Sequence, residues 1–374
     1  MTKPTVGILS MQRVINYGSF LQAYALRELL NKNGAGEVYF IDIIPGPILV
    51  ESPTANKNRC IKYLKFLYQL ATTSNIISGF KTYFLKKRVS QSIKNAWSIL
   101  RLDESPTYPL DLVIIGSDEV FNCCQDVPWG YSSQLFGDIP LEIAHKIASY
   151  AGSFGYTQIE DLKRYGVDFE IAQNLKKMVA VSVRDGNSYE IVKDLIGQSP
   201  YLHVDPVLAY GYKSEIDSFK KRPYKRPYII IYSYQDRINN PSEIYAITEY
   251  ARTSGFTLLS IFCRYDWCDE AIVPRTPVEV LHWFKYADCI ITDTFHGTIF
   301  SIITHSKFAT LVRESNYNKL HYLLSSLNLE DREVSLKQSI SETLDREIDY
   351  SGCETRLEVF RKQTNDFLWI LLNK

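Results

Sequence analysis

Short runs of hydrophobic residues alternate with helical patterns along most of the chain. The first run, 6–10, is followed by a polar turn at 16–18, and residues 20–33 then place leucines and alanines at helical spacing. A second hydrophobic run, 38–44, ends at Pro45. This strand–helix–strand order predicts that the two strands pair in parallel.

The same alternation continues to residue 206, stops, and then starts again. Further strands are predicted at 110–115, 147–151, 178–183 and 201–204, and further helices at 160–175 and 189–196. Residues 213–227 hold six Lys or Arg and two prolines with little periodicity, so they are predicted to form a linker. After it, strands are predicted at 228–234, 256–262, 289–292 and 308–312, and helices at 241–254, 277–286 and 297–304.

The predicted fold class is therefore α/β, with two domains that each contain a mainly parallel sheet. The first domain spans 1–212 and the second 228–353, with the linker 213–227 between them. A long helix at 354–374 follows. It can close the second domain or cross back to the first.

A basic segment interrupts the first domain at about 52–102. It contains ten Lys or Arg and no Asp or Glu, so the rest of this neutral chain carries a net charge of −10. Tyr, Phe and Leu alternate with the cations, which predicts two or three amphipathic helices. Either these helices form a solvated insert whose apolar face joins the core, or residues 57–101 make a peripheral contact with anionic phospholipid or with a pyrophosphate-linked substrate.

The amino-acid composition excludes several classes of protein. The chain has 374 residues, 42 cationic and 42 anionic side chains, 45% hydrophobic residues and 26 tyrosines. These values are typical of a globular protein and argue against a dedicated nucleic-acid binder. No hydrophobic run reaches the length of a membrane span, and the chain starts directly with a strand pattern, so a cytoplasmic protein is expected. The seven cysteines show no zinc spacing, and neither a metal nor a cofactor is expected.

Candidate functional residues gather where the predicted strands end. Ligands of parallel α/β sheets bind beyond the carboxyl ends of the strands. Asp118 follows one apolar strand, and its carboxylate can orient a sugar, accept a proton from a hydroxyl, or simply cap a loop. Arg184 follows another strand, and its planar fork suits a phosphate or a carboxylate, including a neighbouring side chain.

The segment Thr292-Asp293-Thr294-Phe295-His296-Gly297 joins a strand to an apolar helix. His296 should lie at the amino end of that helix, where the helix dipole disfavours imidazolium and attracts anions. Gly297 permits close approach of a ligand or of backbone. A capped or core histidine is the alternative, but the position at a strand end favours a functional role.

Taken together, these segments resemble the polysaccharide pyruvyl transferase family. The matching segments, in family order, are Asn16–Leu26, Gly116-Ser117-Asp118, Ser149–Gly155, Ser182-Val183-Arg184-Asp185, Asp205-Pro206 and Thr292–Gly297. The resemblance implies a glycosyltransferase-B-like fold, in which two Rossmann-like domains face a cleft. It also implies transfer from phosphoenolpyruvate, a co-substrate, to form a cyclic pyruvate ketal on a sugar of a cell-surface polysaccharide or its lipid-linked precursor.

The resemblance implies that Arg184 binds the donor and that His296 takes part in catalysis. We add Asp118 as a second catalytic candidate. Family members often carry a donor-binding Arg where this chain has Thr294, so the second anion anchor is expected at Arg313 or at the helix amides near Gly297. The remaining candidates are polar groups at strand ends and helix starts. We predict Asn16 and Gly18 as further donor contacts, and Ser117, Tyr150, Tyr234 and Asp293 as acceptor contacts.

Two other functions fit the same architecture. One is a nucleotide-sugar glycosyltransferase, for which Glu314 is the candidate to hold a ribose. The other is a non-catalytic sugar-binding relative, which Thr294 in place of the expected Arg would favour. For the transferase, the expected partners are phosphoenolpyruvate and a sugar acceptor, polyprenyl-linked if the enzyme works at the inner face of the cell membrane.

Overall fold

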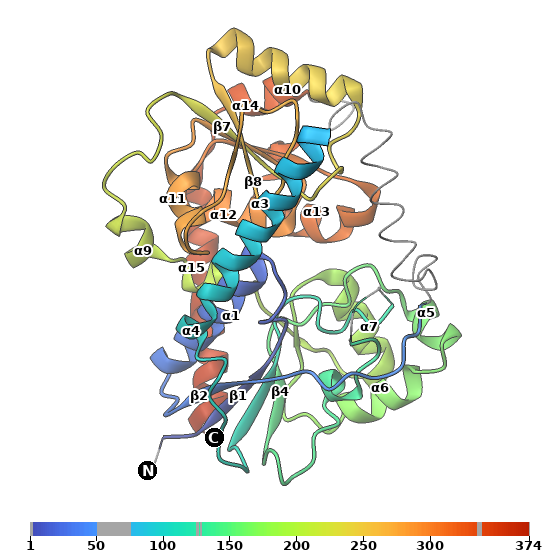
Figure 1. The fold of residues 1–374 in the computed structure, drawn as a ribbon. Helices are drawn as coiled ribbons and strands as arrows, with labels where there is room; N and C mark the ends of the chain where they lie inside the picture. The colour runs from blue at the N-terminus through green and yellow to red at the C-terminus, as the bar shows by residue number, and fades with distance from the viewer. Residues whose placement is uncertain (1–2, 51–75, 125–126, 128, 335–338, 374) are drawn as a thin grey trace.

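Two parallel sheets, one in each half of the chain, form the frame of the molecule (Figure 1). This computed structural model describes residues 3–50, 76–124, 127, 129–334 and 339–373. The strand order of the first sheet is β2-β1-β3-β4, and that of the second is β12-β11-β10-β7-β8-β9. The predicted α/β class, with a mainly parallel sheet in each half of the chain, is confirmed.

The first sheet is built from short apolar strands. They are β1 (Val6–Leu9), β2 (Val38–Ile41), β3 (Leu112–Ile115) and β4 (Ile147–Ser149). All residues of β1 and β3 are buried, as expected for strands covered on both faces. Parallel bridges at Ala148–Ala180 and Gly152–Val183 continue this sheet toward β5 (Ser182–Val183) and β6 (Tyr201–Leu202).

Helices cover both faces of the first sheet. They include α1 (Tyr17–Lys32), α5 (Ile159–Arg164), α6 (Asp168–Leu175), α7 (Gly186–Ile196) and α8 (Pro206–Tyr210), with a 3-10 turn at Ser133–Phe136. Helix α1 begins after Asn16, whose side-chain oxygen accepts a hydrogen bond from the Gly18 amide at 2.7 Å. Its leucines and alanines at helical spacing are buried in the core.

The second sheet repeats this construction. Its strands are β7 (Tyr228–Tyr232), β8 (Thr257–Ile261), β9 (Glu270–Ile272), β10 (Cys289–Thr292), β11 (Phe308–Leu311) and β12 (Glu333–Val334). Its helices are α10 (Pro241–Ser254), α11 (Glu279–Lys285), α12 (Phe295–Ile303), α13 (Tyr317–Ser326) and α14 (Ile340–Asp345), with 3-10 turns at Glu314–Asn316 and Glu330–Arg332. Every residue of β7 and β10 is buried, so these strands form the centre of this half.

The segment 213–227, predicted as a linker, starts with a short helix, α9 (Lys213–Ser218). The ammonium of Lys285 in α11 donates hydrogen bonds to the carbonyl oxygens of Ile216 and Phe219, at 2.8 and 3.0 Å. These contacts fix the end of α9 against the second half of the chain.

The final helix, α15 (Tyr350–Asn373), crosses from the second half back to the first. Near its start, Tyr350 donates a hydrogen bond to the carbonyl oxygen of Ser306 at 2.6 Å. Further along, Thr364 lies 3.0 Å from the hydroxyl of Tyr150, and Asn365 accepts a hydrogen bond from Asn33 at 2.9 Å. The helix therefore connects both halves.

The basic insert is described from residue 76 onward and forms α3 (Ile76–Asn95) and α4 (Trp97–Leu100). Helix α3 runs across both halves in Figure 1. Its inner face buries Leu85, Val89 and Ile93 in the main core, so the apolar face of the insert does join the core. The first part of the insert, up to residue 75, lies outside the described residues, and so does any helix predicted there.

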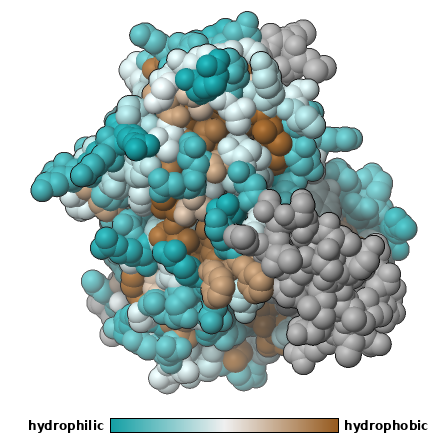
Figure 2. All heavy atoms as spheres, turned by 45° about the horizontal axis from the view of Figure 1, so that its top comes forward, coloured by the Kyte–Doolittle hydropathy of each residue, from teal (hydrophilic) through white to brown (hydrophobic). Residues whose placement is uncertain are grey.

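Apolar side chains on the surface lie in small areas. On the face shown in Figure 2, apolar side chains in brown form separate patches among hydrophilic ones. Within the described part of the chain, no helix combines the length and the apolar character that crossing a bilayer requires.

Candidate functional site

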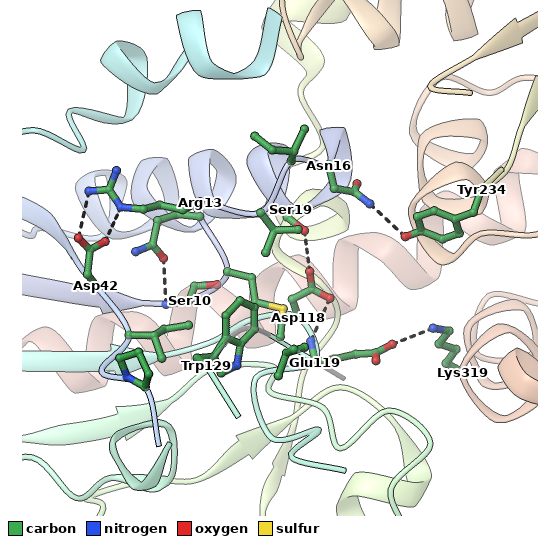
Figure 3. A pocket seen from close by; sticks show the side chains of 17 residues that line it. Ser10, Arg13, Asn16, Ser19, Asp42, Asp118, Glu119, Trp129, Tyr234 and Lys319 are labelled. Carbon is green, nitrogen blue, oxygen red and sulfur yellow. Dashed lines mark hydrogen bonds and ion pairs between the residues drawn. The ribbon is translucent and has the colours of Figure 1, made fainter. Parts of the chain in front are cut away.

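A cleft between the two sheets contains two adjoining cavities. The larger, here called the outer groove, has a volume of about 820 Å³ and is shown in Figure 3. The smaller, here called the inner cavity, has a volume of about 70 Å³ and lies among strand ends of both halves. Both are lined by Asn16, Ser19, Asp118, Glu119, Tyr234 and Lys319. The two cavities therefore meet at one set of polar side chains.

His296 lies in the inner cavity at the first turn of α12. Thr294 caps this helix, because its hydroxyl accepts the Gly297 amide hydrogen at 2.9 Å. The Nε2 atom of His296 is 3.7 Å from Oδ2 of Asp205 and has no hydrogen-bond partner within the described structure. Burial lowers the pKa of His296, although the nearby Asp205 and Asp118 carboxylates oppose this change.

The ring of His296 packs closely against the backbone of α1 at Gly18. A Cβ atom added at Gly18 would lie 2.3 Å from both Cγ and Nδ1 of His296. The absence of a side chain at Gly18 therefore lets α1 of the first half and α12 of the second half approach at this point. Gly18, predicted as a donor contact, lines neither cavity, and its amide donates a hydrogen bond to Asn16.

Arg184 enters the inner cavity from the end of β5. Its guanidinium donates to Asp205 at 3.1 Å and to Asp118 at 3.4 Å, and its central carbon lies 4.3 Å from the centre of the Phe295 ring. Its Nε has no hydrogen-bond partner within the described structure. The residue is buried, so its charge is held in a fixed orientation between two carboxylates.

Asp118 sits at the boundary between the two cavities. Its backbone has a φ of +76°, which turns the carboxylate toward the hydroxyl of Ser19 at 3.1 Å and the amide of Glu119 at 2.9 Å. Burial alone would raise the pKa of Asp118, but Arg184, His296 and these hydrogen bonds lower it overall. Asp118 is therefore an ionised hydrogen-bond acceptor at neutral pH.

Two cations of the inner cavity, Arg237 and Lys319, were not predicted from the sequence. Arg237 pairs with Asp293 at 2.8 Å, and Lys319 pairs with Glu119 at 2.7 Å across the cleft, as Figure 3 shows for the second pair. Arg237 follows strand β7 closely, so the same strand-end argument that identified Arg184 could have found it. Lys319 lies within α13, and no sequence signal points to it.

Asn16, predicted as a donor contact, and Tyr234 and Asp293, predicted as acceptor contacts, all line the inner cavity. The side-chain amide of Asn16 donates to the hydroxyl of Tyr234 at 3.0 Å, joining the two halves across the cleft (Figure 3). Asp293 lines only the inner cavity and accepts a hydrogen bond from Ser233 at 2.6 Å. Burial raises the pKa of Asp293, which Ser233 and Arg237 partly oppose. Its contacts indicate that it holds Arg237, whereas Tyr234 faces both cavities.

Two residues predicted as acceptor contacts, Ser117 and Tyr150, lie in the core. Both side chains are fully buried and line neither cavity. The Ser117 hydroxyl donates to Gln22 at 2.9 Å, and the Tyr150 hydroxyl donates to the carbonyl oxygen of Val204 at 3.0 Å. Successive side chains of a strand point in opposite directions, so residues at a strand end can turn into the core.

Arg313 and Gly297, predicted as donor contacts, are both bonded to other residues of the chain. Arg313 forms a bidentate ion pair with Glu243, at 2.5 and 2.8 Å, and lines neither cavity. The Gly297 amide is occupied by the cap of Thr294, and a Cβ atom there would lie 2.2 Å from the Thr292 hydroxyl. Gly297 therefore allows tight packing of the helix start.

The described residues contain no group of three or more His, Cys, Asp or Glu side chains that could hold a metal ion.

The outer groove differs from the inner cavity in the side chains that line it. It combines the indole of Trp129 with the ion pair of Arg13 and Asp42, at 2.5 Å (Figure 3). An aromatic face beside charged hydrogen-bonding groups suits a sugar, which presents both C–H and hydroxyl surfaces.

Comparison with known proteins gives a family assignment. The family model for polysaccharide pyruvyl transferase matches residues 16–315. No curated protein sequence matches the chain. Solved structures similar to it include the Streptomyces glycosyltransferase SsfS6 complexed with thymidine diphosphate (13% identity, 98% of this chain and 99% of that one, TM-score 0.47). Another is the Neisseria meningitidis UDP-GlcNAc 2-epimerase bound to UDP-GlcNAc (9% identity, 97% and 93%, TM-score 0.44).

The matched range contains the strand ends, the cations and the histidine that line the inner cavity, from Asn16 to Asp293 and His296. Lys319 lies just beyond it. Because this match covers most of the chain, the protein belongs to the polysaccharide pyruvyl transferase family.

Proposed function

We propose that the protein forms a cyclic pyruvate ketal on a sugar, with phosphoenolpyruvate as donor and phosphate as leaving group. The acceptor is a sugar of a cell-surface polysaccharide or of its lipid-linked precursor. The observation that carries the proposal is the junction of the inner cavity, which holds a histidine and three cations, with the outer groove. Family membership supports a transferase of polysaccharide synthesis.

The inner cavity suits a small donor with two anionic groups. Arg184, Arg237 and Lys319 all line it, and each already faces at least one carboxylate. The donor would therefore bind by competing with Glu119 for Lys319 and with Asp293 for Arg237. Lysine and arginine each have several N–H donors, so a cation can hold the donor without losing its carboxylate entirely.

The reaction balances with two acceptor hydroxyls and one donor. Carbon 3 of phosphoenolpyruvate gains a proton and becomes the methyl group, while two C–O bonds form at carbon 2. The bond between carbon 2 and the phosphate oxygen breaks. One hydroxyl proton replaces the proton given to carbon 3, and the other leaves with phosphate.

His296 is the group we assign to proton transfer. Its low pKa makes it neutral in the free protein at neutral pH. Binding of an anionic phosphate nearby would raise this pKa and favour the imidazolium, which can donate to carbon 3. The neutral ring then accepts a hydroxyl proton, so one group serves both steps.

Asp118 is assigned to orienting the acceptor. Its lowered pKa makes it a weak base but a good hydrogen-bond acceptor for a sugar hydroxyl. It lines both cavities, so a hydroxyl bound to it in the outer groove would face the donor. Ser19 and Arg184 fix its two oxygens in direction.

The first experiment is calorimetry with phosphoenolpyruvate on the wild type and on Arg184→Ala. Because that change leaves the buried Asp205 and the partly buried Asp118 without their cation, Lys319→Met is the second variant; it unpairs only the partly buried Glu119, which keeps its hydrogen bond from Asn122. Arg313→Ala is the matched control, since Arg313 lies outside both cavities. We expect saturable binding that both cavity variants weaken and the control retains. Phosphate release with sugar acceptors, followed by detection of the ketal, then tests turnover.

Three results would contradict the proposal. The first is no binding at millimolar phosphoenolpyruvate, with and without a sugar mixture. The second is equal weakening by the Arg313 control. The third is tighter binding of nucleotide sugars, which would favour a glycosyltransferase. Glu314, the residue expected to hold a ribose in that case, is exposed and lines neither cavity.

A further inference from the structure

The outward face of α3 carries a stripe of aromatic and cationic side chains, here called the α3 stripe. It consists of Phe80, Phe84, Lys87, Gln91 and Lys94. These positions are spaced by four, three, four and three residues, so they follow one side of the helix. All five are exposed, and the two phenylalanine side chains are 50% and 57% accessible.

The helix cannot rotate to hide these aromatic rings. Its opposite side buries Leu85, Val89 and Ile93 in the core. The buried Ser92 donates a hydrogen bond to the carbonyl oxygen of Pro274 at 2.7 Å. The orientation of α3 is therefore fixed by packing, and its exposed aromatic residues are a permanent feature of the surface.

Further side chains extend the α3 stripe on both sides. Tyr83 is 54% exposed and its ring lies 5.7 Å from that of Phe84. A groove of about 440 Å³ adjoins the stripe. It is lined by Phe80, Lys81, Phe84, Leu85, Arg88, Arg264 and Ala271. The groove shares Phe80 and Phe84 with the stripe and adds three cations, of which Arg264 is paired with Asp266 at 3.1 Å.

The charge distribution selects the kind of partner. Residues 76–95 contain five Lys or Arg and no Asp or Glu, and all five cations are exposed. Outside 52–102 the chain carries a net charge of −10, so an anionic surface attracts this face and repels the rest. A second copy of the chain is disfavoured, because a two-fold contact would bring two cationic stripes together.

We propose that the α3 stripe is a docking surface for an anionic lipid bilayer. The lysines and arginines interact with lipid phosphates, and the aromatic rings enter the region between headgroups and acyl chains. Reversible peripheral binding needs two signals, charge and apolar contact, and this surface supplies both. The inference does not depend on the proposed transfer reaction, since it concerns a different surface from the two cavities.

The test is co-sedimentation of the full-length protein with vesicles. One set contains phosphatidylcholine alone, and the other contains about one third phosphatidylglycerol. The charge variant is Lys87→Glu, Arg88→Glu and Lys94→Glu combined, and the apolar variant is Phe80→Ser with Phe84→Ser. The matched control reverses three exposed cations at the ends of α5 and α6, Lys163, Arg164 and Lys176, and so makes the same change in net charge.

We expect the wild type to bind the anionic vesicles and to lose binding as salt is raised. Each cation near an anionic surface strengthens binding by about fivefold, so the charge variant should bind more than tenfold more weakly. The apolar variant should bind more weakly and the control should bind normally. Circular dichroism should show native folding for all variants, because every substituted side chain is exposed.

Several results would overturn the inference. They are no binding of the wild type to the anionic vesicles, equal binding to neutral ones, and equal losses in the charge variant and its matched control. Concentration-dependent dimerisation in light scattering, abolished by Phe80→Ser and Phe84→Ser, would also overturn it by identifying a second copy as the occupant.

Discussion

Gly18→Ala tests whether the position of the His296 ring determines catalysis. The new Cβ atom would lie 2.3 Å from two ring atoms, whereas contacting carbon atoms prefer a separation of about 3.5–4.0 Å. The ring must therefore move by roughly 1 Å or more. Displacements of about 1 Å at a reacting group cost on the order of 100-fold in rate, and we expect a loss of that size in kcat/KM.

Stability should change far less than activity in this variant. Overpacking costs about 1–3 kcal/mol, but alanine in a helix is favoured over glycine by roughly 0.5–1 kcal/mol. Because Gly18 lies in α1, the second effect offsets part of the first, and the free energy of unfolding should fall by about 2 kcal/mol or less. Initial rates of phosphate release and thermal unfolding would measure the two quantities separately.

Gly186→Ala is the matched control. Gly186 also lies in the first turn of a helix, two residues after Arg184, but a Cβ atom there meets only Tyr322 at 3.8 Å, an ordinary contact. We expect wild-type rates from this control. If Gly18→Ala retained activity within about threefold of wild type while His296→Ala was inactive, the contact with Gly18 would not be what positions the ring. If both retained activity, the catalytic assignment of His296 would be wrong.

Three further predictions follow from the site and its surroundings. The pH profile of kcat/KM should report a His296 pKa below 6.5 in the free enzyme, and the profile of kcat a higher value, because the bound phosphate favours imidazolium. Coincident profiles, or ones unchanged by removing this histidine, would contradict the role. Lys319→Met should raise KM for phosphoenolpyruvate about tenfold or more while Arg313→Ala leaves it unchanged, and equal KM values for the two variants in rate assays would contradict the donor assignment. Burial lowers the pKa of His203 to about 4. Between pH 6.5 and pH 4 the unfolded chain therefore binds a proton at this histidine that the folded chain does not bind. The free energy of unfolding should thus fall by about 3 kcal/mol as the pH falls through this range. Urea unfolding across this range should show a clearly weaker acid dependence in His203→Phe, and an unchanged dependence would show that another group is responsible.

Much of the fold follows from local pattern in the sequence. Apolar runs without charge predicted the first four strands and β7, β8, β10 and β11, because strands buried on both faces exclude charged side chains. The edge strands β9 and β12, which each begin with a glutamate, were not predicted. Repeats at helical spacing predicted α1, α10 and α15, and the alternation of the two patterns predicted parallel sheets in two domains. Asp118, Arg184 and His296 were chosen as candidates because each lies within four residues after a strand, where ligands of such sheets bind, and all three line the inner cavity.

Other features depended on contacts between distant parts of the chain. Lys319 reaches the inner cavity only because α13 faces Glu119 across the cleft, and Arg313 is removed from it by Glu243 in α10. Ser117 and Tyr150 also follow strands, yet their side chains turn into the core. The sequence by itself determined where strands and helices form and where their polar ends lie, because those are set by neighbours along the chain. Only the tertiary structure decided which side chains meet at the cleft, because side-chain direction and ion pairing there are set by residues 200 or more positions apart, as for Lys319 and Glu119 or Asn16 and Tyr234.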